Sequence, residues 1–420
     1  MGRTTATGWQ LVIVGMLVTI ASCVNPPPPQ APHPPAADRY QRAASPDPAA
    51  RASATQELIF DPHANAPRLL LVMMTRDVDP EVRARAAEAL ARRRDPSFDS
   101  ALEAAAAVEP DPATRARKQA AYEQLWPWRK RPGTAAAYAL FPGGGHFYLR
   151  EPGAGAAYLV GIVGTLAAAA TLISGEIALD GSAGSAKVPV GLVLGIAAQN
   201  LWFYSIFDAY RDARVLRDDA GYQHPITRET LDELVLAPFD PRVLKSPWVW
   251  GGVPIALGLG LGFSYLVDKE AFDEAKTIRD VDKVNVLGHR FNRGTGFLAG
   301  SAYFVSMFAP VGVGEEALFR GVIQTEMEER LGTTWGLIAS SAIFGAVHTF
   351  NFLQNDPKTA LVAVPLISVV GSSLGLAYQH TGYKLKTSVA MHFWYDTLLS
   401  MAAFALDPEH QPFVVTYTAL

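Results

Sequence analysis

The sequence is nearly devoid of cysteine, since Cys23 is the only one among its 420 residues. A single thiol excludes a disulfide framework, and it also excludes a cysteine nucleophile if Cys23 is acylated. An excess of basic charge is missing as well, because the formal net charge is −4 at pH 7 and the pI is about 6.2. This balance gives no support for nucleic-acid binding, and we expect no nucleic-acid partner.

Hydrophobic residues are abundant. They make up 49% of the chain, and the mean hydropathy is +0.12 although the N-terminal third is polar. After residue 134, apolar runs of about 17–22 residues recur, which is the length of a helix that crosses a bilayer. We therefore predict an all-α, polytopic bundle of transmembrane helices. The runs lie at residues 154–174, 188–208, 248–267, 296–313, 333–352, 360–379 and 386–406.

The start of the chain indicates export or anchoring. A basic first segment, an apolar stretch from Leu11 to Ile20 and the tetrapeptide Ile-Ala-Ser-Cys ending at Cys23 resemble a bacterial lipoprotein signal. We predict a signal peptide at residues 1–22 and lipidation of Cys23. An uncleaved anchor and ordinary signal cleavage are the alternatives. Residues 23–54 are rich in proline and alanine and predict a semi-extended linker.

Residues 55–128 predict a charged helical domain. Asp79-Pro80 opens the segment DPEVRARAAEAL, and Asp111-Pro112 opens DPATRARKQAAYEQL 32 residues later. In both segments the aspartate can cap a helix whose first turn accepts the proline. This recurrence resembles a short HEAT-type repeat, which stacks helix pairs and offers a surface to a protein partner. A plain bundle of helical hairpins is the alternative.

Residues 134–214 predict a small multi-helix membrane module. FPGGGHFYL at 141–149 and NLWFYSIFDAYRDAR at 200–214 resemble bacterial membrane modules that combine a glycine-rich turn with a closing helix. Glycine allows a tight bend that a side chain would block, and we interpret the motif as a packing feature. His146 and Asp208 are ionisable groups near the membrane boundary, but no second motif indicates a task for them.

Lysine and arginine predict the orientation in the membrane. The segment 209–247 carries six of them and is therefore expected in the cytoplasm. A lipidated Cys23 would place residues 55–128 outside, so both expectations hold only if 134–149 also crosses the membrane. We predict a multi-pass protein of the bacterial inner membrane, with membrane lipid as a partner. Its N-terminal domain is expected to be extracytoplasmic.

Polar clusters interrupt the most apolar third of the chain. Insertion of a charged side chain into a bilayer costs roughly 2.5–3.5 kcal/mol. Such a side chain is therefore expected where it is buried inside the helix bundle and has a function. Solvated charges at the membrane surface and packed histidines are the alternatives. The clusters are Glu315-Glu316 with Arg320, Phe344 with His348, and His392 with Asp396.

The spacing within these clusters predicts how their side chains point. Glu316 and Arg320 are four residues apart and can pair on one helical face. Glu315 is turned away by about 100° and is free to point into a cavity, after Gly312 and Gly314 loosen the helix. His392 and Asp396 also lie one turn apart and face the same way.

The order and spacing of the clusters resemble the CPBP family of intramembrane endopeptidases, which includes the enzyme that trims prenylated CAAX proteins and the bacterial Abi proteins. The family pattern is EExxxR, then FxxxH, then HxxxN or HxxxD, and the chain supplies all three. The resemblance covers residues 295–406 within a predicted protease domain at 248–406.

The resemblance implies a mechanism of peptide hydrolysis. Glu315 and His348 would activate a water for attack on a peptide carbonyl, and His392 with Asp396 would hold the oxyanion. Glu316 and Arg320 would orient the helix. The family-based expectation is a reaction without metal or other cofactor.

Asp396 departs from the CAAX-processing members, which carry asparagine at this position. An ionised aspartate cannot donate a hydrogen bond to an oxyanion. Asp396 must therefore be protonated, orient His392, or bind a metal. Zinc is the alternative cofactor, because these two residues with Glu315 and His348 would also form an O/N ligand set.

We predict an intramembrane endopeptidase that acts on a membrane-associated protein or peptide, with a possible protein partner for the helical repeats. A catalytically silent scaffold, immunity protein or receptor is the first alternative. A transporter is the second, since proton-relay groups also lie in membrane spans. The sequence lacks the paired, Gly/Pro-interrupted hydrophobic segments that are typical of inverted repeats.

Overall fold

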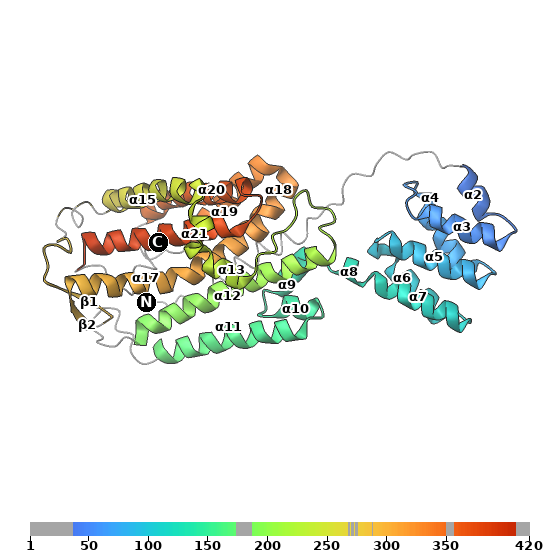
Figure 1. Cartoon of the computed structure of the whole chain (residues 1–420), viewed down its shortest axis with the longest axis horizontal. Helices are drawn as coiled ribbons and strands as arrows, with labels where there is room; N and C mark the ends of the chain where they lie inside the picture. The colour runs from blue at the N-terminus through green and yellow to red at the C-terminus, as the bar shows by residue number, and fades with distance from the viewer. Residues whose placement is uncertain are drawn as a thin grey trace. The chain divides into compact units, whose positions relative to one another are not determined.

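The computed structural model describes residues 37–173, 187–267, 269, 273, 276–287, 289–349 and 357–408. The predicted signal peptide, Cys23 and the linker up to residue 36 lie outside the described residues. The chain divides into two compact units (Figure 1). One unit holds described residues 37–131 and 213–221, and the other holds the remaining described residues.

The N-terminal unit consists of short helices that pack on one another, including helices that are not consecutive in the sequence. Asp38 and Arg42 pair on the first of them. The helices are α2 (Ala37–Ala43), α3 (Pro48–Leu58), α4 (Asn65–Arg76), α5 (Pro80–Arg92), η1 (Pro96–Phe98), α6 (Asp99–Ala107), α7 (Pro112–Gln124) and α8 (Trp126–Arg129).

The 32-residue repeat begins one copy earlier than the sequence analysis indicated. Residues 37–54, which we assigned to the linker, form α2 and part of α3. Asp47 caps α3 by accepting a hydrogen bond from the backbone N–H of Ala49, and Pro48 occupies its first turn. Asp47, Asp79 and Asp111 therefore start equivalent helices at equal spacing.

Equivalent arginines support the same periodicity. Arg51 pairs with Asp77 and also donates to the carbonyls of residues 45 and 46. Arg83 pairs with Glu109 and donates to the carbonyls of residues 77 and 78. Each arginine thus ties the turn before its own helix to an acid 26 residues later.

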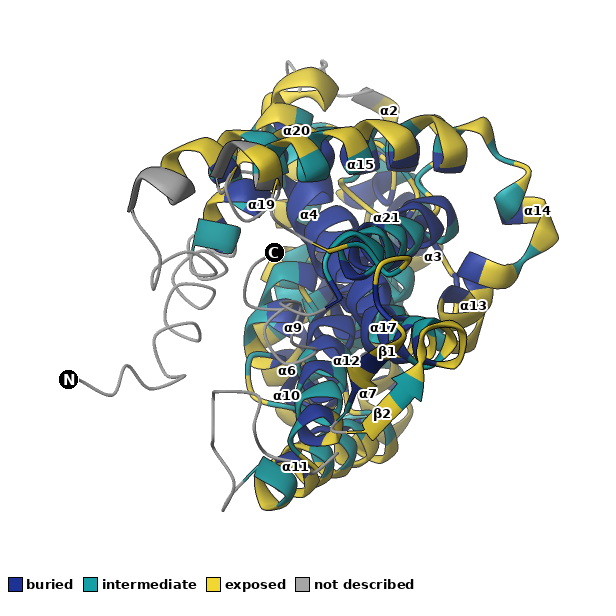
Figure 2. Ribbon diagram, turned by 90° about the vertical axis from the view of Figure 1, so that its left-hand side faces the viewer, coloured by how far each residue is buried: buried dark blue, intermediate teal, exposed yellow. Residues whose placement is uncertain are grey.

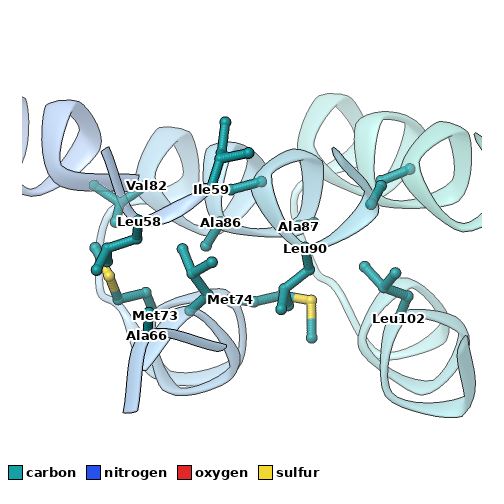
Figure 3. Close-up of a cluster of buried hydrophobic side chains, with 14 of the residues drawn as sticks. Leu58, Ile59, Ala66, Met73, Met74, Val82, Ala86, Ala87, Leu90 and Leu102 are labelled. Atoms are coloured by element: carbon teal, nitrogen blue, oxygen red, sulfur yellow. The ribbon is translucent and has the colours of Figure 1, made fainter. Parts of the chain in front are cut away.

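An alanine- and leucine-rich core holds the repeats together (Figure 3). Leu58, Leu70, Met74 and Leu90 are fully buried. Small alanines on α5 let neighbouring helices approach closely, and the larger side chains fill the spaces between them. This core explains why the segment folds as helices although its surface is highly charged.

One group of ion pairs is buried within the repeats, around Glu109 in the connection between α6 and α7. Glu109 accepts a hydrogen bond from Arg83 at 2.5 Å and another from Lys118 at 2.5 Å. The Arg83 guanidinium, against the opposing effect of burial, holds the pKa of Glu109 at about 2, with a further contribution from Lys118. Glu109 is therefore ionised throughout the physiological pH range.

The second unit is a bundle of long helices with short connecting elements. A two-stranded antiparallel hairpin pairs Val284 with Phe291, which the sequence analysis did not predict. The elements are α9 (Pro132–Tyr138), α10 (Gly144–Tyr148), α11 (Pro152–Ile173), α12 (Lys187–Leu216), α13 (Leu231–Leu236), η2 (Ala237–Phe239), α14 (Pro241–Leu244), α15 (Pro247–Val267), β1 (Lys283–Val286), β2 (His289–Asn292), α17 (Arg293–Glu316), η3 (Ala317–Gln324), α18 (Thr325–Leu331), α19 (Thr333–Val347), α20 (Pro357–His380) and α21 (Leu385–Leu406).

The predicted polytopic helix bundle is confirmed. Most of the described residues of each of the seven apolar runs lie in a helix, namely α11, α12, α15, α17, α19, α20 or α21, although α19 ends at Val347, before the end of the 333–352 run. Among the described residues, five helical stretches are long and apolar enough to cross a membrane: 152–173, 187–216, 293–331, 361–380 and 385–406. Apolar side chains such as Val160 and Leu361 project outward, as a lipid-facing surface requires.

Helix α21 occupies the interior of this unit (Figure 2). It packs against α15, α17 and α20, and Phe393 and Phe404 on its surface are fully buried. Phe404 stacks on Phe297 and meets Phe304 edge to face, so aromatic contacts join α21 to α17. This packing fixes the position of α21 along α17, and α17 carries the two glutamates of the first polar cluster.

The structure decides one question of orientation. Helices α9 and α10 contain only 7 and 5 residues, far fewer than the roughly 20 that span a bilayer. The segment 134–149 is therefore not a spanning helix. Two candidate spans, 152–173 and 187–216, follow residue 132 before the basic segment is reached. With an even number of crossings, residue 132 and the 209–247 segment lie on the same side of the membrane. Cys23 cannot then be outside while the 209–247 segment is in the cytoplasm.

Candidate active site

All three polar clusters meet inside the second unit. Glu315 and Glu316 are the last residues of α17, and Arg320 lies in η3, which has π-helical geometry. His348 follows α19 directly, and His392 and Asp396 lie on α21. Segments of π-helix are rare and frequently occur at functional sites. The sequence analysis did not predict this one.

Two glycines of α17 have a different role from the one expected. The helix continues through Gly312 and Gly314 to Glu316, so they do not loosen it. A side-chain carbon at Gly314 would lie 2.5 Å from Asn200 on α12, and one at Gly312 would lie 3.1 Å from the carbonyl of Val389 on α21. The glycines therefore allow α12 and α21 to pack closely against the end of α17.

Glu315 points between the two histidines. Its Oε2 lies 3.7 Å from Nε2 of His348 and 3.9 Å from Nε2 of His392. Only 8% of the residue is exposed, and within the described part of the chain this oxygen has no hydrogen-bond partner. The distances are too long for direct hydrogen bonds. They suit groups that act on one shared water or hydroxyl.

His348 presents one nitrogen to Glu315 because its other nitrogen is occupied. Nδ1 lies 2.7 Å from the carbonyl oxygen of Phe344 and donates its proton there. A neutral imidazole that donates through Nδ1 keeps a lone pair on Nε2. The FxxxH spacing therefore favours the tautomer of His348 that is protonated at Nδ1, whose Nε2 can accept a proton beside Glu315.

Glu316 holds both Arg320 and His392. It is fully buried, and it accepts a hydrogen bond from Nε of Arg320 at 3.1 Å, as the sequence predicted. Its other oxygen accepts from Nδ1 of His392 at 2.9 Å. Sequence reasoning missed this second contact, which joins residues 76 positions apart. Glu316 therefore fixes the ring orientation of His392.

Nε2 of His392 faces carboxylates. Asp396 Oδ2 lies 3.3 Å away and Glu315 Oε2 lies 3.9 Å away. Because Nδ1 donates to Glu316, a hydrogen bond to either acid needs a second proton on Nε2 or a protonated acid. The arrangement thus places an ionisable imidazole nitrogen within 4 Å of both acids.

Phe344 packs against several members of the site. Its ring lies 4.7 Å from the guanidinium carbon of Arg320 and meets Phe319 edge to face at 5.0 Å. It also lies 4.5 Å from the ring of His348. A cation over an aromatic face is attracted by the ring quadrupole. Phe344 therefore packs against Arg320 and His348 and restricts the positions of both side chains.

The segment before α15 positions the start of α21. Glu229 accepts a hydrogen bond from the backbone N–H of Leu385 at 2.6 Å, and a carboxylate is favourable at a helix N-terminus. Trp394 donates to the carbonyl of Pro238 at 2.9 Å, and Phe239 meets Phe393 edge to face. No spacing signal in the sequence could have identified these contacts.

The alternative zinc set is more open than a structural zinc site. Ligands at the usual zinc distances lie about 3.4 Å apart. The separations from Glu315 to His348 and His392 are 3.7 and 3.9 Å. Among the described residues, three ligand atoms come within 4.8 Å of one another only at His146, Glu151 and Asp212. His392 Nε2 and Asp396 Oδ2 lie 3.3 Å apart, close to that separation, so zinc stays the alternative to a metal-free site.

Comparison with known proteins agrees with the motif positions. Residues 297–398 match a family model described as type II CAAX prenyl endopeptidase Rce1-like. The match covers about a quarter of the chain and includes all three polar clusters. No curated protein and no solved structure matched the chain.

Proposed function

We propose that the chain is an endopeptidase that cleaves a membrane-associated protein or peptide, as the match of residues 297–398 to the CAAX-type intramembrane protease family supports. The observation that carries this proposal is the position of Glu315 between His348 and His392 in the interior of a helix bundle. A buried acid next to two imidazoles is suited to proton transfer in a low-dielectric site.

Glu315 and His348 are the pair that activates water. Water bound between them loses a proton as its oxygen attacks the scissile carbonyl, and that proton passes to the leaving amine. The hydrogen bond from His348 to the Phe344 carbonyl leaves Nε2 free to take part. Both side chains are held before substrate arrives, which lowers the cost of orientation.

His392 stabilises the negative charge on the carbonyl oxygen. Glu316 accepts from Nδ1, and Asp396 lies beside Nε2 and favours a proton there. A protonated Nε2 in this fixed ring can donate to a substrate oxyanion that lies beside it. Of the three roles open to Asp396, orientation of His392 therefore has the best support.

We expect Asp396→Asn to keep at least about a tenth of the activity, because the side-chain carbonyl of asparagine can still accept from Nε2 of His392 and orient it, as in the HxxxN form of the motif. Asp396→Ala should reduce kcat/KM by about 10²-fold, because His392 loses its orienting partner and so acts poorly as the oxyanion donor. The measurement is kcat/KM for both variants on one cleaved peptide. An Asn variant as inactive as the alanine variant, with both folded, would argue against this role.

A cleavage screen tests the function itself. Wild type, Glu315→Ala and His348→Ala are compared in native-like membranes, with products identified by mass spectrometry. His289→Ala is the matched control, because His289 is an exposed histidine of the hairpin. We expect product from wild type and control alone, and no effect of a chelator. A fully active Glu315→Ala would end the proposal, and loss of activity with chelator would support the zinc version.

We propose further that residues 37–131 face the cytoplasm, in place of the extracytoplasmic location inferred from Cys23. Two candidate spans between residues 132 and 217 return the chain to the side from which it entered. Basic residues gather on that side, at 129–131 and in 209–247.

Thiol labelling tests this orientation. With a membrane-impermeant maleimide, Ser97→Cys should react only after the cells are opened. His289→Cys lies beyond α15, an apolar helix of 21 residues that we propose also crosses the membrane, and it should react in intact cells. The parent chain, whose only thiol is Cys23, serves as the blank. Reaction of Ser97→Cys in intact cells would restore the extracytoplasmic location.

A further inference from the structure

Helix α12 packs against the segment that carries the first polar cluster, although α12 lies outside the residues that match the protease family. The sequence predicted only a packing feature for the 134–214 module, to which α12 belongs. In the structure α12 runs alongside α17 (Figure 1). Its contacts with residues 314–326 give the module a part in the proposed site.

Two glycines bring α12 close to segment 314–326. An added side-chain carbon at Gly314 would lie 2.5 Å from the backbone carbonyl oxygen of Asn200. An added carbon at Gly321 would overlap the ring of Phe207. Both contacts advance by the same interval along the two chains, so the helices run in the same direction and meet along one face of each. Each glycine allows a close approach that a side chain would block.

A buried hydrogen bond fixes the far end of this contact. Tyr210 is fully buried, and its hydroxyl donates to Oε1 of Glu326 at 2.7 Å. Tyr222 donates to the same oxygen at 2.7 Å. Glu326 lies on α18, which directly follows the π-helical turn η3. The contact with α12 therefore begins at the residue before Glu315 and ends just beyond the π-helical turn.

Helix α12 and the histidines lie on different sides of segment 314–326. At about 100° per residue, Glu316 is turned by about 200° from Gly314 and points away from α12. Its partner on that side is His392 of α21. Helices α19, α20 and α21 all contact η3. The segment is thus held between α12 and the helices that supply the histidines.

The π-helical turn depends on contacts of this kind. A rare backbone conformation persists where the surrounding structure determines it. We propose that Asn200, Phe207 and Tyr210 are positioning residues of the active site, which hold segment 314–326 so that its two glutamates face the two histidines. This role rests on the proposed hydrolysis, since the three residues act through Glu315 and its neighbours rather than by contact with substrate.

Exchange of size across the contact tests the proposal. Gly321→Ala adds a methyl group that overlaps the ring of Phe207, whereas Phe207→Leu leaves a gap beside Gly321. With the peptide found in the cleavage screen, Gly321→Ala should lower kcat by about 10–100-fold with little change in KM, because a misplacement of about 1 Å can cost that much. Phe207→Leu should lower kcat by a smaller factor.

The double variant Gly321→Ala/Phe207→Leu should perform better than either single variant. The shorter leucine makes room for the added methyl group, so kcat should return to within about threefold of wild type. Gly258→Ala is the matched control, because an added carbon at this position of α15 has no described neighbour within 4 Å beyond its own helix. It should keep wild-type kcat.

The ring nitrogens of His392 give a second readout, which needs no substrate. Nitrogen NMR of the full-length protein in detergent, with labelled histidines, reports the hydrogen bond from Nδ1 to Glu316. The signals are identified by their loss in His392→Gln. The Nδ1 signal should shift in both single variants and return in the double variant, whereas Gly258→Ala should leave it in place.

Folded single variants with unchanged His392 signals would overturn the proposal, because α12 would then only pack against the segment. Lower melting temperatures without a shift of these signals would have the same meaning. If Gly321→Ala does not fold, Phe207→Leu, which adds no clash, decides by the same signals. A shift that the double variant reverses, in a protein that cleaves no peptide, would keep the positioning role and end the proposed hydrolysis.

Discussion

Glu315→Gln is expected to lower kcat/KM by at least about 10³-fold while the protein stays folded. Glutamine has nearly the same size and shape, but it cannot accept the proton of the attacking water, and general-base catalysis contributes about 10²–10⁴-fold. Oε2 of Glu315 makes no direct hydrogen bond within the described residues, so the change removes no hydrogen bond of that oxygen. The loss should therefore fall on kcat rather than on stability.

The double variant Glu315→Gln/His348→Ala makes this test sharper. If the two residues act on one water, removal of either disables the step, and the double variant should be no more than about threefold worse than the poorer single variant. Independent roles would instead multiply the two losses. Glu233→Gln, which alters an exposed acid of α13, is the matched control and should keep wild-type activity. Multiplicative losses would show that Glu315 and His348 do not act on the same water.

The membrane helices could be predicted because their signal is local. A run of about 20 apolar residues indicates both a helix and its membrane environment, and in all seven runs most of the described residues are helical. The first copy of the repeat was missed for the opposite reason. Proline and alanine around Asp47 are also typical of linkers, and only the buried contacts of Ala52 and Ala54 distinguish a packed helix from an extended tether.

The site was predictable in its members but not in its arrangement. Spacing of four residues indicated the pairs Glu316–Arg320 and His392–Asp396, and both contacts are present. The bond from His392 to Glu316 joins two helices and leaves no trace in local spacing. The same holds for the π-helical turn, since it depends on how α17 continues against its neighbours. The catalytic roles of these residues stay predictions.

Arg320→Met is expected to destabilise the protein by about 3–5 kcal/mol, because it leaves the buried Glu316 without its guanidinium partner. Both side chains have no measurable exposure. Methionine retains much of the volume that packs against Phe344, so the loss reports the missing charge rather than a cavity. Unfolding in a mild detergent, followed as the midpoint of a denaturant or thermal transition, measures it.

The double variant Glu316→Gln/Arg320→Met should recover most of that loss. Replacement of both members of a buried ion pair is often neutral, whereas removal of one is not. Two of the Arg320 nitrogens have no hydrogen-bond partner in the described part of the chain, so the native pair already carries a desolvation cost. The side-chain carbonyl of a glutamine in place of Glu316 can still accept from Nδ1 of His392, and activity should therefore stay within about tenfold of wild type. A double variant as unstable as Arg320→Met would show that the arginine acts through packing, and that Glu316 needs no charge partner to hold His392.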